Sequence, residues 1–393
     1  MSAATSNLIE AIDDSEELRR DEFPVVRDGV FMGHAGVTAL PRRVADAVVD
    51  YTRAASSSQQ EFGDVLKRIE QTRADCARLI GARQREIALL GPTSLGLSLF
   101  ANGIDWADGD EILCYADDYP ANVYPWQNLA RLGVRIRQIE PERRGEISAE
   151  LVAASLTPRT RLVALASCHF LTGYRIDIDA IGRIVHDHGA LFSLDAIQTL
   201  GAFPTDVGHV DFLSADSHKW LLGPLTAGIV YVRESRFRDL RPTLLGAWNV
   251  RSPNFITQQR IEFEDGARRY EPGVLNAAGI FGMQAAVNLL DTIGIEQVAG
   301  RILDLKARLV AGLRASGCEI LGPAAGPHAS GITTFSHPGR PASRILQQFT
   351  ADGISASHRH DREGNEFIRL SPHFYNTHSE IDRVLESLAR ALA

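Results

Sequence analysis

Seven short apolar runs alternate with helix-type segments between residues 86 and 234, and this alternation constrains the fold more than any other feature. Between two of the runs, the segment IDAIGRIVHDHG (178–189) carries apolar residues three and four positions apart, as an amphipathic helix does. Repeated strand–helix units predict a mainly parallel, seven-stranded sheet between helices, with ligands bound at the carboxyl ends of the strands. The predicted strands cover 86–91, 111–116, 134–140, 161–168, 190–196, 211–217 and 227–234.

The pattern changes after this α/β region. Two long helical segments, 277–294 and 298–317, precede short strand candidates at 331–337 and 367–371 and a last helix over 379–393. This order is typical of a smaller α+β domain, against which the N-terminal segment could pack. The expected division is an N-terminal segment 1–30, a large domain 31–270 and a small C-terminal domain 271–393.

The charge of the chain disfavours nucleic acid as a partner. The formal net charge is −8, and no run of Lys and Arg is present, whereas phosphate binding needs a basic face. A small-molecule substrate is therefore expected. The acidic first residues lack the basic and apolar regions of a signal peptide, and the apolar runs are too short to span a bilayer. We expect no membrane contact and a cytoplasmic location.

A metal site is not expected from the sequence. The cysteines have neither a CxxC nor a zinc-like spacing and indicate buried free thiols. His186 and His188 precede Gly189 at a predicted helix end, where cations are favoured in any case. The four cysteines are Cys76, Cys114, Cys168 and Cys318.

A lysine and an aspartate follow neighbouring strands of the predicted sheet. Asp195 ends the run ALFSLDA, with Gln198 three residues later, and Lys219 follows the next run in LSADSHKWLLGP. Their side chains are expected to meet at one edge of the sheet. Such a pair suits pyridoxal phosphate (PLP), because a lysine forms its Schiff base and a carboxylate pairs with its pyridine nitrogen.

A phosphate cradle is predicted at the start of a helix. In LLGPTSLGLSLF, Thr93 and Ser94 follow a strand and open a helix, so that hydroxyl and backbone donors can face an anion. Taken alone, these residues are more typical of an ordinary helix cap.

In this order, the parts resemble the class V aminotransferases of PLP fold type I, the group that includes cysteine desulfurases, kynureninases and isopenicillin N epimerase. The resemblance runs from FMGHAGVTALP (31–41) to FIRLSPHFYNTHSEID (367–382), and HKW followed by GP favours the epimerase-like branch. It implies PLP as cofactor, an amino-acid substrate and a homodimer.

The resemblance also implies roles for matching residues near the cofactor. Lys219 matches the Schiff-base lysine, and His218 matches the neighbour that contacts the phosphate. Asp195 matches the partner of the pyridine nitrogen, and Gln198 matches the donor to the ring hydroxyl. Thr93 matches the phosphate-binding threonine.

Other matches concern the ring face, the substrate and the second subunit. Tyr119 falls where desulfurases stack a histidine on the ring. Arg369 matches the arginine that holds the substrate α-carboxylate, for which a two-pronged donor is well shaped. The stretches around Trp248 and Asn276 are those expected to reach across the dimer, and Trp248 is assigned to the cofactor site.

Several positions depart from the family pattern. Desulfurases carry a nucleophilic cysteine before the C-terminal arginine, but no cysteine follows Cys318 here. Asp216 replaces a phosphate-binding serine, for which Ser217 could compensate. Pro92 removes an N–H from the phosphate loop, and Val274 replaces a threonine. Phe170 makes the substrate-facing wall apolar where relatives carry an asparagine.

These features predict an enzyme that acts at Cα and Cβ of an amino acid through an aldimine. A C–S lyase (β-elimination) without a catalytic cysteine is ranked first, with a class V aminotransferase or an amino-acid epimerase close behind. Kynureninase-type hydrolysis and a non-catalytic binding protein are less favoured. A nicotinamide enzyme is set aside because the chain lacks a G-x-G-x-x-G opening.

Overall fold

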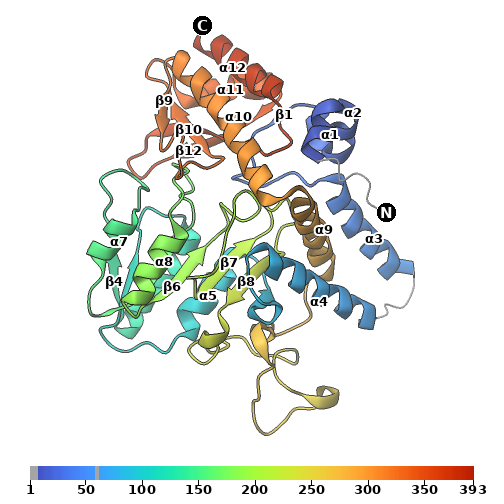
Figure 1. Ribbon diagram of the computed structural model, residues 1–393, viewed down its shortest axis with the longest axis vertical. Helices are drawn as coiled ribbons and strands as arrows, with labels where there is room; N and C mark the ends of the chain where they lie inside the picture. The colour runs from blue at the N-terminus through green and yellow to red at the C-terminus, as the bar shows by residue number, and fades with distance from the viewer. Residues whose placement is uncertain (1–7, 58–61) are drawn as a thin grey trace.

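A seven-stranded sheet lies at the centre of the protein in the computed structural model, which describes residues 8–57 and 62–393 (Figure 1). The strand order is β2-β8-β7-β6-β5-β3-β4. All neighbours pair in parallel except β8, which is antiparallel to β7 and β2. The predicted mainly parallel sheet is confirmed. The strands are β2 (Ile87–Leu89), β3 (Glu111–Cys114), β4 (Arg135–Gln138), β5 (Thr160–Ala166), β6 (Leu191–Asp195), β7 (Phe212–Asp216) and β8 (Gly228–Val232).

Helices cover both faces of this sheet, which explains why its central strands read as continuous apolar runs. Every residue of β6, β7 and β8 is buried. Successive residues of β5 enter opposite cores: Val163 joins the core with α4, α8 and α9, and Leu162 joins the core with α5 and α6. The helices are α3 (Arg42–Ser57), α4 (Phe62–Leu79), α5 (Thr93–Gly103), α6 (Tyr124–Gln127), α7 (Ala149–Ser155), α8 (Ile178–Asp187) and α9 (Ala277–Ile293).

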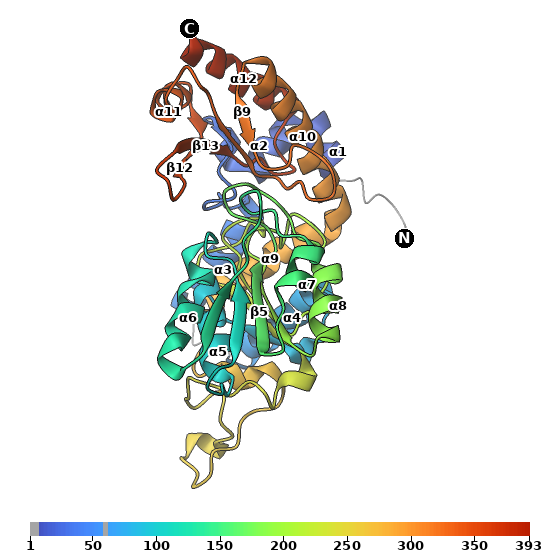
Figure 2. The ribbon, with the colours of Figure 1, turned by 90° about the vertical axis from the view of Figure 1, so that its left-hand side faces the viewer.

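A smaller antiparallel sheet, in the order β12-β13-β10-β9, packs with the C-terminal helices at one end of the molecule (Figure 2). It has its own apolar core. The predicted fold class, a large α/β part with a smaller α+β part, is thereby confirmed. The elements are β9 (Glu319–Leu321), β10 (Thr333–Ser336), β12 (Ser357–His360), β13 (Glu366–Leu370), α10 (Ile295–Ala315), α11 (Ala342–Ala351) and α12 (His378–Leu392).

The N-terminal segment packs against this C-terminal part. β1 (Val30–Phe31) pairs in parallel with β11 (Ile354–Ser355). In α2 (Glu16–Glu22), which follows α1 (Leu8–Asp14), the buried Arg19 donates to Glu380 at 3.0 Å. Residues 1–7 of the predicted N-terminal segment lie outside the described residues, and the predicted domain boundaries stay a prediction.

No single helix in the described ranges 8–57 and 62–393 is long and apolar enough to cross a membrane. The helices α9 and α10 meet that test only as a pair, and they are bent by 82° where they join. Most of α9 is buried inside the protein.

A buried ion pair ties α4 to the large sheet. Arg73 and Glu271 are 2% and 4% exposed, and their closest atoms are 2.6 Å apart. Glu271 also accepts the backbone N–H of Leu89 in β2, and Arg73 donates to the carbonyl of Ile87. The pair therefore provides hydrogen-bond partners for the backbone of the edge strand β2, and each member neutralises the charge of the other.

We expect Arg73→Ala to lower the free energy of unfolding by about 3–5 kcal/mol, because Glu271 would be left buried without a countercharge. Urea unfolding followed by circular dichroism measures this change. Lys67→Ala is the matched control, since Lys67 lies on the same helix but pairs with Asp64 in solvent. Equal midpoints for the two variants would contradict the prediction.

Candidate active site

A cavity of about 530 Å³ lies where the carboxyl ends of β6 and β7 meet the start of α5 and the small sheet. Its size is typical of a site for a cofactor or small ligand. Trp248 instead lines a second cavity together with Val274. The predicted site residues brought together in the first cavity are Thr93, Ser94, Tyr119, Asp195, Gln198, His218, Lys219 and Arg369.

Lys219 is an amine in a largely dry environment. The residue is 8% exposed, and its Nζ lies 5.3 Å from the centre of the Tyr119 ring. Burial is the main cause that lowers the pKa of Lys219 to about 8. Asp195 opposes this shift, and the guanidinium groups of Arg369 and Arg359 add to it. A substantial fraction of the amine is therefore neutral and nucleophilic near physiological pH.

Asp195 is the last residue of β6 and is 2% exposed. Its Oδ1 accepts the backbone N–H of Ile197 at 3.0 Å. Burial raises the pKa of Asp195 to about 6, against the effects of this hydrogen bond and of Lys219. A cationic ring nitrogen in the cavity would favour the ionised carboxylate.

Asp118 is a second buried carboxyl group, which the sequence patterns did not single out. Its Oδ2 accepts from the amide of Asn122 at 2.9 Å, and its Oδ1 accepts the N–H of Tyr119 at 2.7 Å. Burial and the charge of Asp195 raise the pKa of Asp118 to about 7. Asp118 therefore orients the backbone that carries Tyr119 and is electrostatically linked to Asp195.

Gln198 is oriented by Trp220, the tryptophan of the HKW segment. The Trp220 indole N–H donates to Oε1 of Gln198 at 2.8 Å, and the Gln198 amide donates to the carbonyl of Ala35 at 3.2 Å. Because a side-chain amide has two N–H groups, one of them stays available to a ligand in the cavity. Trp220 thus positions Gln198 and was missed as a site residue from the sequence.

The start of α5 is suited to an anion. Pro92 occupies the N-cap position, and among the described residues no side chain caps this first turn. The Thr93 hydroxyl accepts the backbone N–H of Asp216 at 2.9 Å, and Ser94 lies beside it in the cavity wall. Free backbone donors and the helix dipole favour negative charge there.

Asp216, which replaces the phosphate-binding serine of the family pattern, does not line this cavity. Its carboxylate accepts the backbone N–H groups of Ser217 at 2.7 Å and Thr226 at 3.2 Å. Nδ1 of His218 lies 3.2 Å from Asp216 Oδ2, outside hydrogen-bond geometry. The Ser217 hydroxyl donates to the carbonyl of Pro224, and Ser217 does not line the cavity either.

Two aromatic side chains form an apolar wall. The rings of Tyr119 and Phe170 meet edge to face with centres 5.6 Å apart. Both residues line the cavity, as expected for the position of Phe170. Tyr119 is 45% exposed, so its ring covers the amine of Lys219 from the solvent side.

Arg369 and Arg359 form the cationic end of the cavity. Arg369 is 1% exposed and donates from Nη1 to the carbonyl of Phe170 at 2.7 Å. Among the described residues, its Nε and Nη2 atoms have no hydrogen-bond partner, and neither does Nε of Arg359. Burial, and then the charge of Arg359, lower the pKa of Arg369 to about 9.

The absence of a side chain at Gly36 leaves space between the two guanidinium groups. A Cβ atom there would lie 3.8 Å from Nη2 of Arg369 and 3.9 Å from Nη2 of Arg359. Both groups therefore approach one region of the cavity wall, beside the carbonyl oxygen of Gly33, which would lie 3.2 Å from the same Cβ atom. A carboxylate in that region would satisfy them in the geometry that arginine prefers. Arg359 was not among the predicted site residues.

Ion pairs join the small sheet to the large one beside the cavity. Arg144 contacts Asp361, Asp117 and Glu363, and the first two contacts are 2.8 Å long. Arg362 contacts Asp117 at 3.0 Å and the carbonyl of Ala116. These contacts hold the β12–β13 turn next to the segment that carries Tyr119.

Comparisons with known proteins agree with this arrangement. The aminotransferase class-V family model matches residues 30–384. A probable cysteine desulfurase from Methanothermobacter thermautotrophicus is 27% identical over 95% of this chain and 97% of its own. The apo structure of a cysteine desulfurase from Thermococcus onnurineus NA1 superposes with a TM-score of 0.89 at 23% identity, covering 95% of this chain and 97% of its own. A complex of the cystine C-S lyase C-DES with its reaction product cysteine persulfide superposes with a TM-score of 0.84 at 22% identity. This match covers 93% of this chain and 99% of the C-DES chain.

The low pKa of Lys219 leads to a pH prediction. The rate at which the apoprotein binds PLP should rise with pH, with its midpoint near pH 8, because only the neutral amine reacts with an aldehyde. Stopped-flow absorbance over a pH series measures this rate, with Lys219→Ala as the blank. In Arg359→Ala the midpoint should move to higher pH, since a neighbouring positive charge is removed. A midpoint near that of an ordinary lysine in the unmodified chain would refute the assignment.

Proposed function

Because this chain belongs to the aminotransferase class-V family and is a PLP-dependent enzyme, we propose that it catalyses β-elimination at the C–S bond of a sulfur-containing amino acid. The reaction would proceed without a desulfurase-type catalytic cysteine. From cysteine, the products would be pyruvate, ammonia and sulfide. The observation that carries the proposal is one cavity that unites a low-pKa lysine, a buried carboxylate and two converging arginines, with no cysteine among its lining residues.

The cavity residues fit PLP in size, charge and donor type. Lys219 would carry the cofactor, and the uncapped start of α5 at Thr93 and Ser94 would hold its phosphate together with His218. Asp195 would keep the pyridine nitrogen protonated, and the free amide N–H of Gln198 would reach the ring hydroxyl. When bound, PLP supplies an electron sink for the pair released as a bond to the substrate Cα breaks.

Other residues of the same cavity would bind and orient the amino acid. The unpartnered nitrogens of Arg369 and Arg359 would hold the α-carboxylate at the space beside Gly36. Tyr119 would cover the cofactor ring, and with Phe170 it would exclude water from the side that faces the substrate. An apolar wall suits a thioether or disulfide side chain better than a charged one.

Lys219 would move the proton. With a pKa of about 8, its Nζ is neutral in about half of the molecules at pH 8 and can accept the Cα proton as a general base. The same amine can return this proton to Cα or to another carbon, which is why epimerisation and transamination share the first half of the reaction.

The state of the cysteines supports elimination over persulfide transfer. All four are buried, and burial raises the pKa of each thiol to about 11 or 12, so few thiolates form at neutral pH. The segment from 319 to 393, which contains Arg359 and Arg369, has no cysteine. Related proteins named cysteine desulfurase point to sulfur amino acids as the substrate class.

We also propose a homodimer that acts in the cytoplasm. Large apolar residues between positions 244 and 274 are 49–69% exposed, as expected of a surface that a second copy covers. Trp248 lies in this region and would reach the partner's cofactor site from it. These exposed residues are Leu244, Leu245, Phe255, Ile256, Ile261 and Val274.

The central test is product analysis of the PLP-loaded protein with cysteine, cystine and a wider amino-acid panel. We expect pyruvate, ammonia and a sulfur product in equal amounts. Lys219→Ala should lose the visible band of the bound cofactor and lower kcat by about 10²–10⁴-fold, whereas the exposed Lys67→Ala should match the unmodified protein.

Other outcomes of that test would replace the proposal. Conversion of the cofactor to its amine form without pyruvate would identify an aminotransferase, and racemisation without cleavage would identify an epimerase. Failure to bind PLP at any concentration would indicate a non-catalytic protein.

Arg369→Lys tests the carboxylate site. Lysine keeps the charge but loses the two-pronged donor, so KM should rise about 10- to 100-fold with a smaller change in kcat. The cofactor band should stay unchanged. Arg183→Lys, at an exposed ion pair on α8, is the matched control. An unchanged KM would show that the substrate carboxylate binds elsewhere.

A further inference from the structure

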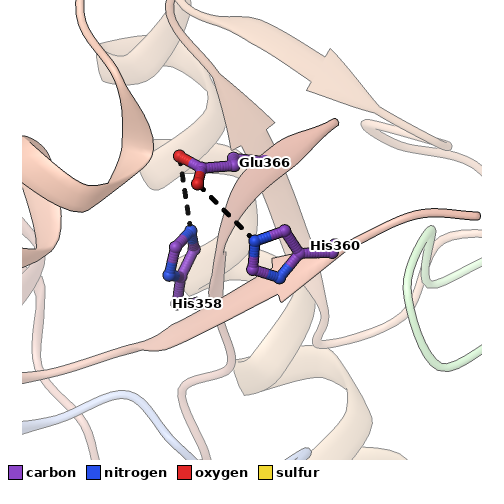
Figure 3. Close-up of side chains that lie close together, drawn as sticks. All are labelled: His358, His360 and Glu366. Atoms are coloured by element: carbon purple, nitrogen blue, oxygen red, sulfur yellow. Dashed lines mark ion pairs between the residues drawn. The ribbon is translucent and has the colours of Figure 1, made fainter. Parts of the chain in front are cut away.

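Two histidines and a glutamate converge on the face of the small sheet opposite to the active-site cavity. His358 and His360 are alternate residues of β12, and Glu366 begins β13 (Figure 3). In the register of the two strands, His358 pairs with Ile368, and His360 pairs with Glu366. Residues that face each other across two strands, and alternate residues along one strand, share a face. The three side chains are therefore brought together by the strand pairing itself.

The distances within this cluster suit a metal ion better than direct hydrogen bonds. Nε2 of His358 and Nε2 of His360 each lie 3.6 Å from a Glu366 oxygen, which is too long for a hydrogen bond. One ligand atom from each of the three residues lies within 4.8 Å of the other two. Ligands bonded to a tetrahedral Zn²⁺ at 2.0–2.1 Å are about 3.3 Å apart. Each imidazole nitrogen is thus close to this separation from one oxygen of Glu366, which is Oε2 for His358 and Oε1 for His360.

One donor of the cluster is buried and unsatisfied. Nε2 of His358 is shielded from solvent and has no hydrogen-bond partner among the described residues. An imidazole nitrogen in that state costs free energy unless a ligand binds it. His360 and Glu366 are about half exposed, so an ion could reach the group from solvent and these side chains could adjust to it.

The turn that joins the two strands pre-organises the site. Asp361 accepts the backbone N–H groups of Glu363 and Asn365, and its own N–H donates to the carbonyl of Asn365. Arg144, in the loop between β4 and α7, contacts Asp361 at 2.8 Å. The backbone that carries His360 and Glu366 is therefore fixed without a metal, which lowers the entropic cost of binding one.

From this geometry we propose that His358, His360 and Glu366 form a binding site for a divalent transition-metal ion of the Zn²⁺ class. Two imidazoles and one carboxylate favour Zn²⁺, Co²⁺, Ni²⁺ or Cu²⁺ over Mg²⁺ or Ca²⁺, which prefer oxygen ligands. Three protein ligands leave a fourth position for water or an external ligand. This group was not among the residues considered from the sequence, because Glu366 joins the two histidines through strand register.

The site lies directly behind the cationic end of the active-site cavity. Arg359 stands between the two histidines on β12, so its side chain is on the opposite face, where it lines the cavity. A bound ion would hold the strand that presents Arg359. The metal site itself does not depend on which reaction the enzyme catalyses.

The test uses the full-length PLP-loaded protein, with any polyhistidine tag removed and with metals stripped by a chelator. Equilibrium dialysis against Zn²⁺ should give one tightly bound ion per chain, and Co²⁺ should give the visible absorption of a tetrahedral or five-coordinate nitrogen–oxygen site. His360→Ala and Glu366→Gln should each weaken Zn²⁺ binding by at least about 10-fold. Loss of a residue that only hydrogen-bonds to a metal ligand already lowers metal affinity by about this factor, and loss of a ligand should lower it at least as much. His378 on α12 pairs with Asp304 on α10, so His378→Ala is the matched control and should bind Zn²⁺ as the unmodified protein does.

Two results would overturn the proposal. The first is an unmodified protein that binds no Zn²⁺, and the second is a Glu366→Gln variant that binds it as tightly as the control. Because Glu366→Gln preserves the shape of the side chain, the cofactor band and the thermal midpoint of that variant verify that weaker binding is not a loss of fold. Weaker binding in both cluster variants with an intact band supports the site.

Discussion

Burial of ionisable groups around one cavity is the constraint on which the site depends. Lys219, Asp195 and Arg369 are all withdrawn from water, and burial opposes the charged form of each group. The pKa of the two cations is lowered, and that of the carboxyl group is raised. A ligand with a cationic ring nitrogen and a carboxylate would reverse the shifts at Asp195 and Arg369. The protein therefore holds its charges in positions that become favourable only with the ligand bound.

The two sheets contribute different parts of this cavity. The carboxyl ends of β6 and β7 and the start of α5 present the groups suited to a cofactor, and β12 and β13 present the two arginines suited to a substrate carboxylate. Since the cavity lies between the sheets, its width depends on their contact. The ion pairs of Arg144 with Asp361 and of Arg362 with Asp117 make that contact beside Tyr119.

Strand alternation links the cavity to the proposed metal site. In β12, Arg359 faces the cavity while His358 and His360 face the other side of the sheet. A period of two places consecutive residues on opposite faces, so a four-residue strand serves two sites without sharing a side chain. The same alternation puts Arg369 on the cavity face and the apolar Ile368 in the core of the small sheet.

The sequence by itself determined the strand–helix alternation, the class V family resemblance and the placement of Asp195 and Lys219 at one sheet edge. It could do so because hydrophobic period reflects local backbone geometry, and because parallel strands all end at the same edge. The tertiary structure alone decided which way Asp216 points, that Trp220 orients Gln198 and that Arg359 joins the cavity. It also brought His358, His360 and Glu366 together. These features depend on strand register and on packing between segments far apart in the chain, neither of which a local pattern encodes.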